Sequence, residues 1–151
     1  NEPAPPIPVI NSDTLNVEQK EAFDKIVNQV ENGQQQLLAI LQASAGCGKT
    51  YLVNALRHRL QSGIVVCSYT GCAAFLIQGH TISSLFSIGF SQKHTTLSPN
   101  AKLEKQRFFE HIKLIVVDEY SMVSTSLLHL MRQRLQEICD STCIMGGKTC
   151  F

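Results

Sequence analysis

Residues 43–50, with the sequence ASAGCGKT, have the residue types that hold a polyphosphate. They follow an apolar run and precede a helical pattern, so backbone N–H groups and the positive end of a helix dipole would converge on one point. In the motif G-x-x-x-x-G-K-[ST] the lysine binds the β- and γ-phosphates and the hydroxyl binds Mg²⁺, and here these residues are Lys49 and Thr50. The nucleotide-binding residues that we expect in the loop are Ala45, Gly46, Cys47, Gly48, Lys49 and Thr50.

Alanine stands at position 43, where the motif has its first glycine. That position lies at the end of the preceding strand, where glycine mainly permits a tight turn. The N–H groups that face phosphate come from the residues between this position and the lysine, so alanine is compatible with the loop if its φ is negative. On this motif alone, a glycine-rich turn with a surface lysine stays open as the alternative.

Two acidic residues, Asp118 and Glu119, follow a second apolar run at residues 114–117. A nucleotide hydrolase needs one carboxylate in the Mg²⁺ shell and another to orient and deprotonate water. We assign Asp118 to the metal and Glu119 to the water, which makes Lys49 and Glu119 the candidate catalytic residues. An Asp-Glu pair after a strand is often only a solvated turn, but the two motifs together favour a nucleotide hydrolase.

Helical and strand patterns alternate around these motifs. Apolar residues recur at helical spacing over residues 17–31, and Asn16 with Gln19 fits a capping box. We expect buried strands at residues 37–42, 64–69 and 114–117, and further helices at residues 52–60, 101–111 and 124–139. This alternation predicts an α/β fold, a parallel sheet flanked by helices.

Composition limits the class of protein. With 151 residues, 44% of them hydrophobic, one domain with its own core is expected. The formal net charge is +1, so any contact with nucleic acid must come from a local basic patch. The apolar runs are far shorter than the roughly 20 residues of a membrane-spanning helix. Residues 1–14 lack the pattern of a secretion signal, so we expect a soluble, intracellular protein with an extended, proline-rich tail.

The six cysteines do not form a Cys-x-x-Cys pair. This spacing favours free thiols in a reducing compartment over disulfides or a zinc site.

Residues 70–86 are rich in small and hydroxylic residues and follow the second predicted strand, at the edge where open α/β sheets bind ligands. Their N–H and hydroxyl groups could hold the phosphates of a nucleic-acid strand, or the segment could be a packed connector. Phe75, Phe86 and Phe90 could stack on bases, although phenylalanine at helical spacing is more often part of a core.

With these motifs in order, the sequence resembles the PIF (petite integration frequency) family of superfamily 1 DNA helicases. The motifs are Leu15-Asn16-Val17-Glu18-Gln19, Ser44-Ala45-Gly46-Cys47-Gly48-Lys49-Thr50, Thr70-Gly71-Cys72-Ala73-Ala74 with Gly79-His80-Thr81-Ile82-Ser83-Ser84, and Asp118-Glu119-Tyr120-Ser121-Met122. The resemblance implies a RecA-like P-loop NTPase domain over residues 15–151, with ATP and Mg²⁺ as cofactors and single-stranded DNA as a partner.

The same resemblance assigns individual residues. It implies that Gln19 reads the adenine edge, although the cap role explains a glutamine there almost as well. The residues that it assigns to the DNA backbone are Thr70, Gly71, His80, Thr81 and Ser83. The family usually has histidine where this chain has Ser83, so that contact differs here.

The activity implied is that of an ATP-dependent DNA helicase, with translocation in the 5′-to-3′ direction and roles in DNA repair and recombination. Two alternatives stay open: a module that binds ATP or single strands without turnover, and a P-loop ATPase that acts on protein. ATP hydrolysis stimulated by DNA in the full-length protein would distinguish a helicase from both alternatives.

Helicases of this family use two motor domains, and the second supplies an arginine finger. We therefore expect the chain to be a fragment of the first motor domain, truncated at its C-terminal end and missing the second motor domain. In this fold the strand that begins near Thr149 would lie between the phosphate-loop strand and the acidic strand. We expect such a fragment to hydrolyse ATP slowly at best and to self-associate through its open sheet. The implied location is the nucleus or mitochondrion if the source is eukaryotic.

Overall fold

A computed structural model describes residues 6–33, 35–44, 46–89, 91 and 93–151 of the chain. Its four strands form one parallel sheet in the order β2-β1-β3-β4. The strands are β1 Ile64–Ser68, β2 His80–Thr81, β3 Leu114–Asp118 and β4 Thr149–Cys150. The α-helices are α1 Val17–Asn32, α2 Lys49–Leu60, α3 Gly71–Leu76, α4 Ile82–Leu85, α5 Pro99–Glu110 and α6 Thr125–Ile138. Short 3-10 turns are η1 Ser12–Thr14, η2 Gln61–Gly63, η3 Tyr120–Met122 and η4 Ile144–Gly147.

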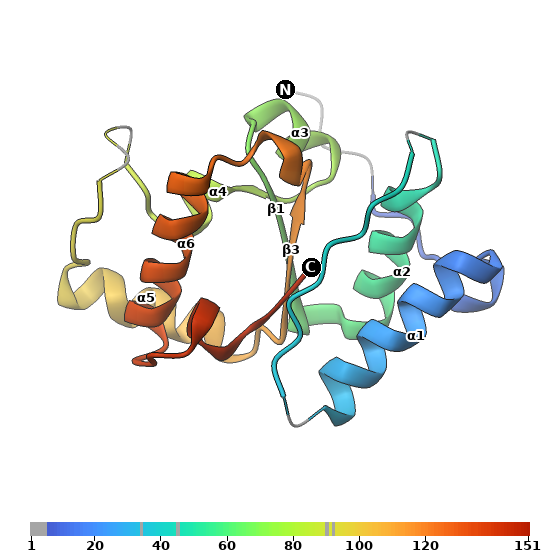
Figure 1. The fold of residues 1–151 in the computed structure, drawn as a ribbon, viewed down its shortest axis with the longest axis horizontal. Coiled ribbons are helices and arrows are strands. Elements are labelled where there is room, and N and C mark those ends of the chain that lie inside the picture. The colour runs from blue at the N-terminus through green and yellow to red at the C-terminus, as the bar shows by residue number, and fades with distance from the viewer. Residues whose placement is uncertain (1–5, 34, 45, 90, 92) are drawn as a thin grey trace.

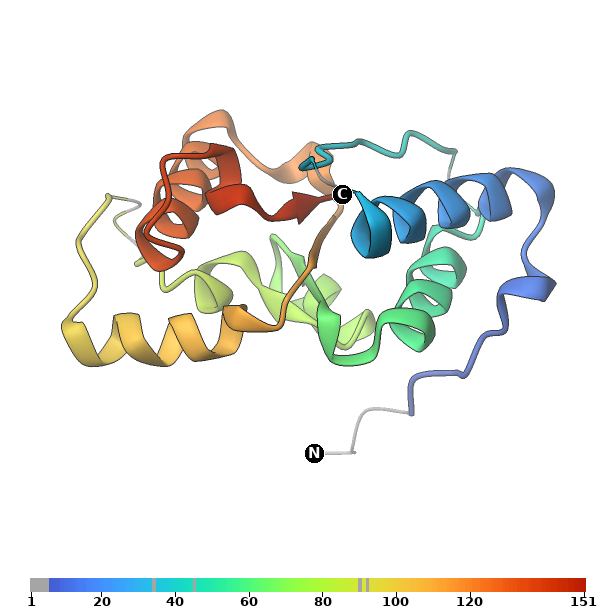
Figure 2. The same cartoon turned by 90° about the horizontal axis from the view of Figure 1, so that it is seen from below.

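Helices cover both faces of the sheet. Figure 1 shows α1 and α2 on one side of β1 and β3, with α5 and α6 on the other, and Figure 2 shows the same two groups from below. Successive residues of β1 enter the two cores in turn: Val65 and Cys67 pack with α4, α5 and α6, and Val66 packs with α1 and α2. This alternation follows from the two-residue period of a strand. The predicted α/β fold with a parallel sheet is confirmed.

Local signals placed most of the elements correctly. The predicted helices over residues 17–31, 52–60, 101–111 and 124–139 correspond to α1, α2, α5 and α6 within a few residues. The capping box of α1 is formed, because Asn16 Oδ1 accepts from the backbone of Gln19 at 2.9 Å and Gln19 Oε1 accepts from the backbone of Asn16 at 3.1 Å. Those signals are contained within one turn of chain, which is why sequence alone located them.

The prediction of a buried strand at residues 37–42 is wrong. In the described chain this segment forms only an isolated parallel bridge from Leu38 to Cys150, and Leu38, Ile40 and Leu41 are 46%, 69% and 36% exposed. Its backbone bonds are made with β4, which is two residues long. A strand needs a hydrogen-bonded neighbour along its length, and an apolar run cannot supply one. The predicted position of β4 is confirmed, since it lies between this segment and β3.

The N-terminal segment is partly anchored. Ile10 and Leu15 pack in the core under α1 and α2, and residues 12–14 form η1. Within the described residues, no helix combines the length and the apolar character needed to cross a membrane. The six cysteines are free thiols.

Candidate nucleotide and DNA sites

The phosphate loop, residues 43–50, connects the segment beside β4 to α2. Gly46 and Gly48 have φ of 79° and 75°, in the left-handed region that glycine adopts without a steric cost. Gly48 is the N-cap of α2, so Lys49 and Thr50 begin the helix and its first N–H groups face the loop. Ala45 lies outside the described residues.

Alanine at position 43 fits the loop. The non-glycine residues with positive φ in the described chain are Gln61, Gln78, Ser87, Glu119, Asp140 and Met145, and Ala43 is not one of them. The φ of Ala43 is therefore not positive, which is the condition under which alanine is compatible with this loop. The Nζ of Lys49 donates to the carbonyl oxygens of Ala43 at 2.9 Å and of Ser44 at 3.0 Å. Two backbone carbonyls thus hold the ammonium that a phosphate would bind.

Gln19 contacts the phosphate loop, which the sequence did not reveal. Its Nε2 donates to the carbonyl oxygens of Cys47 at 3.2 Å and Gly48 at 3.3 Å, while its Oε1 completes the capping box of α1. A Cβ at Gly48 would come too close to that Nε2 and would displace the Gln19 amide from the loop, while the positive φ of Gly48 itself favours glycine. The predicted role of Gln19 in capping α1 is confirmed. Its recognition of adenine stays a prediction, and there the base would compete with the loop carbonyls for the Gln19 amide.

The acidic pair lies where β3 ends. Asp118 is the last residue of β3, and its carbonyl oxygen accepts from Ser68 Oγ of β1 at 3.4 Å. Glu119 is exposed and has φ of 54° and ψ of 42°, which is unusual for a residue with a side chain. Its carbonyl accepts from the backbone of Met122 at 2.9 Å and closes η3. Backbone strain of this kind occurs preferentially at functional sites.

The sheet register brings the candidate sites to one edge. Thr81 of β2 and Asp118 of β3 are both paired with Ser68 of β1. Adjacent strands lie about 4.8 Å apart, so the backbones of Thr81 and Asp118 are separated by about 10 Å. The segment before the phosphate loop runs parallel to β4, and β4 runs parallel to β3, so the loop leaves the sheet at the same edge (Figure 1).

Two hydroxyls that were assigned to DNA are helix caps. Thr70 Oγ1 accepts from the backbone of Ala73, and Thr81 Oγ1 accepts from the backbone of Ser84, both at 3.1 Å. These bonds satisfy N–H groups at the starts of α3 and α4. The pattern of a threonine before a short helix carried this information, but the helices themselves were not predicted.

The other candidate DNA residues are more open. Gly71 and Ser83 are exposed, and a Cβ at Gly71 would meet nothing within 4 Å. His80 is exposed, and its ring packs edge-to-face on Phe108 with a centroid distance of 6.0 Å and an interplanar angle of 85°. All five candidates therefore lie in residues 70–83, a stretch that begins just after β1 and in which buried and exposed residues alternate.

The phenylalanines of this region differ from one another. Phe86 is completely buried and stacks on Phe109 with ring centroids 5.8 Å apart, so the core interpretation is confirmed for it. Phe75 is 61% exposed on α3, contrary to that interpretation. Phe90 lies outside the described residues.

Metal binding by protein groups alone is not indicated in the described chain, which has no group of three or more His, Cys, Asp or Glu side chains suited to it. Mg²⁺ in phosphate-transfer enzymes is usually held by one or two protein groups together with the substrate phosphates. The helix-start hydroxyl of Thr50 and the strand-end carboxylate of Asp118 fit that pattern.

The chain is similar to known helicases. The family model described as PIF1-like helicase matches residues 14–151. The ATP-dependent DNA helicase Pif1 of Campylobacter jejuni is 31% identical over 107 residues, which cover 64% of this chain and 24% of that protein.

Two solved structures are similar over most of the chain. Unliganded Pif1 from Bacteroides sp matches with a TM-score of 0.68 and 27% identity, covering 91% of this chain and 31% of that one. Pif1 helicase from Bacteroides in complex with ADP-AlF3 and ssDNA matches with a TM-score of 0.69 and 26% identity, covering 86% and 30%. The similarity supports the RecA-like form of the α/β fold, and the chain spans about a third or less of each of these relatives.

Proposed function

The chain belongs to the PIF1-like helicase family, and we propose that it is part of the first motor domain of an ATP-dependent DNA helicase. The observation that carries the proposal is the meeting of three features at one sheet edge: the phosphate loop, Asp118, and Thr81 with its neighbours. Because the chain covers 24% of the Campylobacter jejuni relative, the coupling of ATP hydrolysis to translocation and unwinding by the whole protein is part of the proposal.

In the proposed nucleotide site, the backbone N–H groups of the phosphate loop hold the β- and γ-phosphates. Lys49 exchanges the carbonyls of Ala43 and Ser44 for phosphate oxygens. Thr50 and Asp118 would hold Mg²⁺, and the ion would neutralise charge on the phosphates. Glu119, exposed just beyond β3, orients the attacking water and accepts its proton.

In the proposed DNA site, Gly71, His80 and Ser83 contact the strand directly. Thr70 and Thr81 cap α3 and α4 and keep this segment in place. The similar Bacteroides Pif1 helicase was solved in complex with ADP-AlF3 and ssDNA, which supports one site for a nucleotide and another for a single strand. The arginine finger of a second motor domain, self-association, the cellular location and a role in repair or recombination stay predictions.

The decisive experiment is a titration of a fluorescent ATP analogue with Mg²⁺ into the chain and its Lys49→Ala variant, with and without oligo-dT. Charge-assisted hydrogen bonds contribute about 1.5–3 kcal/mol, so Lys49→Ala should weaken binding by roughly 10- to 150-fold. Lys25→Ala, at an exposed position of α1, is the matched control and should leave the affinity unchanged.

The results of this titration distinguish the helicase proposal from the two alternative functions. Oligo-dT should change the affinity for the analogue if both ligands bind at one edge of the sheet. Equal binding by the Lys49→Ala variant, or no binding by a sample that unfolds cooperatively, would contradict the proposed nucleotide site. Saturable ATP binding without any response to DNA would favour an ATP-binding module or a P-loop ATPase that acts on protein.

A further inference from the structure

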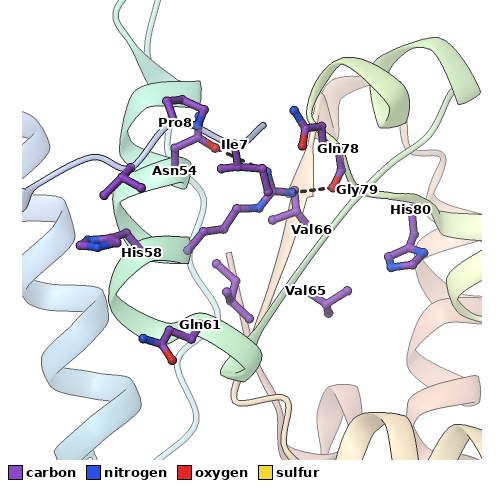
Figure 3. A pocket seen from close by; sticks show the side chains of 13 residues that line it. Ile7, Pro8, Asn54, His58, Gln61, Val65, Val66, Gln78, Gly79 and His80 are labelled. Carbon is purple, nitrogen blue, oxygen red and sulfur yellow. Dashed lines mark hydrogen bonds between the residues drawn. The ribbon is translucent and has the colours of Figure 1, made fainter. Parts of the chain in front are cut away.

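A pocket of about 440 Å³ lies beside β1 and is separate from the phosphate loop. Its walls come from α2, from β1, from the turn between α3 and β2, and from residues 7–9 (Figure 3). Neither the loop residues 46–50 nor Asp118 line it. The pocket is therefore a site to which the proposed ATPase chemistry assigns no role.

The polar centre of the pocket is Arg57 of α2, which is half-buried. Its Nη1 donates to the carbonyl of Ile77 at 2.6 Å and to Oδ1 of Asn54 at 3.4 Å, and its Nη2 donates to the carbonyl of Gln78 at 3.2 Å. Within the described chain, Arg57 forms no ion pair, and none of the lining residues is acidic. Burial lowers the pKa of Arg57, consistent with a cation that lacks a carboxylate beside it.

The guanidinium has capacity for a ligand. Three of its five N–H groups make the hydrogen bonds just described. The other two N–H groups can donate to a bound ligand. The planar fork of arginine suits phosphate and carboxylate oxygens, and a partly desolvated cation gains from an anionic partner. Holding the carbonyls at the end of α3 is a structural role of Arg57, but that role uses only part of the side chain.

The surroundings select the kind of anion. Ile7, Pro8 and Asn54 lie close together at one end of the pocket, Gln78 and Gly79 lie across from them, and Val66 lies between (Figure 3). The apolar walls beside Arg57 suit a sugar or base attached to the anionic group.

His80 lies farther along the same pocket (Figure 3). It also belongs to the proposed DNA site, so the two surfaces share a residue.

We propose that this pocket binds the phosphate of a nucleotide, with Arg57 as its principal ligand. The nucleotide is either free or one unit of a DNA strand, and only the second source rests on the proposed function. This pocket is distinct from the phosphate loop, so a negative result here would not contradict the proposed ATP site at Lys49.

The test uses the Lys49→Ala variant, in which the phosphate loop contributes little, at constant ionic strength. Inorganic phosphate, AMP and a short oligo-dT are titrated separately while NMR follows the Arg57 Nε–H and the backbone amides of Gln78 and Gly79. Saturable shifts at these groups with AMP or oligo-dT are expected. Tighter binding of AMP identifies a free nucleotide, and tighter binding of oligo-dT identifies a DNA strand.

Three further substitutions decide the role of Arg57. Arg57→Gln should weaken binding at least about 10-fold, since it removes the charged fork. The Arg57→Gln substitution can also disturb the α3–β2 turn, so Gln61→Glu tests the same site without changing Arg57. It adds a negative charge at an exposed position of the pocket wall and should also weaken binding of the anionic ligand. Arg59→Gln removes the same charge from an exposed residue outside the pocket and should have no effect.

Two outcomes would overturn the proposal. One is the absence of shifts at Arg57 with AMP and oligo-dT, even if inorganic phosphate alone produces them. The other is unchanged affinity for both ligands in the Arg57→Gln and Gln61→Glu variants.

Discussion

The candidate nucleotide site and the candidate DNA site lie at one edge of one sheet but are assembled in different ways. The nucleotide site combines Gln19, Lys49 and Asp118, which come from parts of the chain far apart in sequence. The DNA site is one continuous stretch, residues 70–83, which contains α3, β2 and the start of α4. In both sites, groups expected to meet a ligand also bond to the protein: Lys49 and Gln19 to the phosphate loop, and the two threonines to helix starts. A substitution there removes a structural bond together with any ligand contact.

Among single substitutions, the largest effect is expected at the aromatic residues of the DNA side. Phe86→Ala should lower the free energy of unfolding by about 3–5 kcal/mol, because it removes a buried ring stacked on Phe109. Phe75→Ala should change it by no more than about 0.5 kcal/mol, because that ring is exposed. Urea denaturation measures both. A loss of oligo-dT affinity in stable Phe75→Ala protein would add Phe75 to the DNA site.

The next effect concerns Gln19 and the nucleotide side. Gln19→Ala removes half of the capping box and both bonds to the phosphate loop, and should cost about 2 kcal/mol of stability. It should also weaken binding of the ATP analogue, because the Gln19 amide no longer ties the carbonyls of Cys47 and Gly48 to α1. Denaturation and analogue titration are the measurements.

Gln19→Glu separates the two roles of that side chain. A glutamate can still accept from the backbone of Asn16, but it places an oxygen against the loop carbonyls. Stability close to wild type with weakened nucleotide binding is expected. Wild-type affinity in this variant would show that the contact with the loop is dispensable.

Alkaline pH probes β1 and its neighbours, which both sites share. Burial raises the pKa of Cys67 and of Cys150 to about 12, from an ordinary value of 9.0. Above pH 9.0 the unfolded chain loses thiol protons that the folded chain keeps, so the free energy of unfolding should fall as pH rises toward about 12. The limit is about 1.4 kcal/mol per pH unit for each thiol. Unfolding followed from pH 8 upward, at about one-unit steps, measures this slope.

The matched control is Cys67→Ala, which should reduce the slope. A slope that Cys67→Ala leaves unchanged would contradict this contribution of the buried thiol.

The smallest effect is expected at the two caps of the DNA side. Thr70→Ala and Thr81→Ala should each cost about 1 kcal/mol of stability, since each removes the acceptor for a helix N–H group. Asparagine at either position can still cap the helix. If the hydroxyls only cap, the Asn variants should bind oligo-dT like wild type in fluorescence anisotropy. Asn variants as weak as the Ala variants would indicate direct contact between the hydroxyls and DNA.

The sequence alone determined the features whose signals are local. The extents of α1, α2, α5 and α6 follow from apolar spacing and caps, and the glycine turn that opens α2, the candidate phosphate loop, follows from eight consecutive residues. The alternation of these elements was enough to predict a parallel sheet between helices. Each signal lies within one or two turns of chain, where the residues that interact are also neighbours in sequence.

Only the tertiary structure decided the remaining features. Residues 37–42 have the apolar character of a strand, yet they pair only near Cys150, because backbone pairing depends on a neighbour more than a hundred positions away. The bond from Gln19 to the phosphate loop and the pocket around Arg57 likewise join segments that no sequence pattern links. Hydrogen bonds and pockets of this kind require two surfaces to meet, and that meeting is set by the packing of the helices on the sheet.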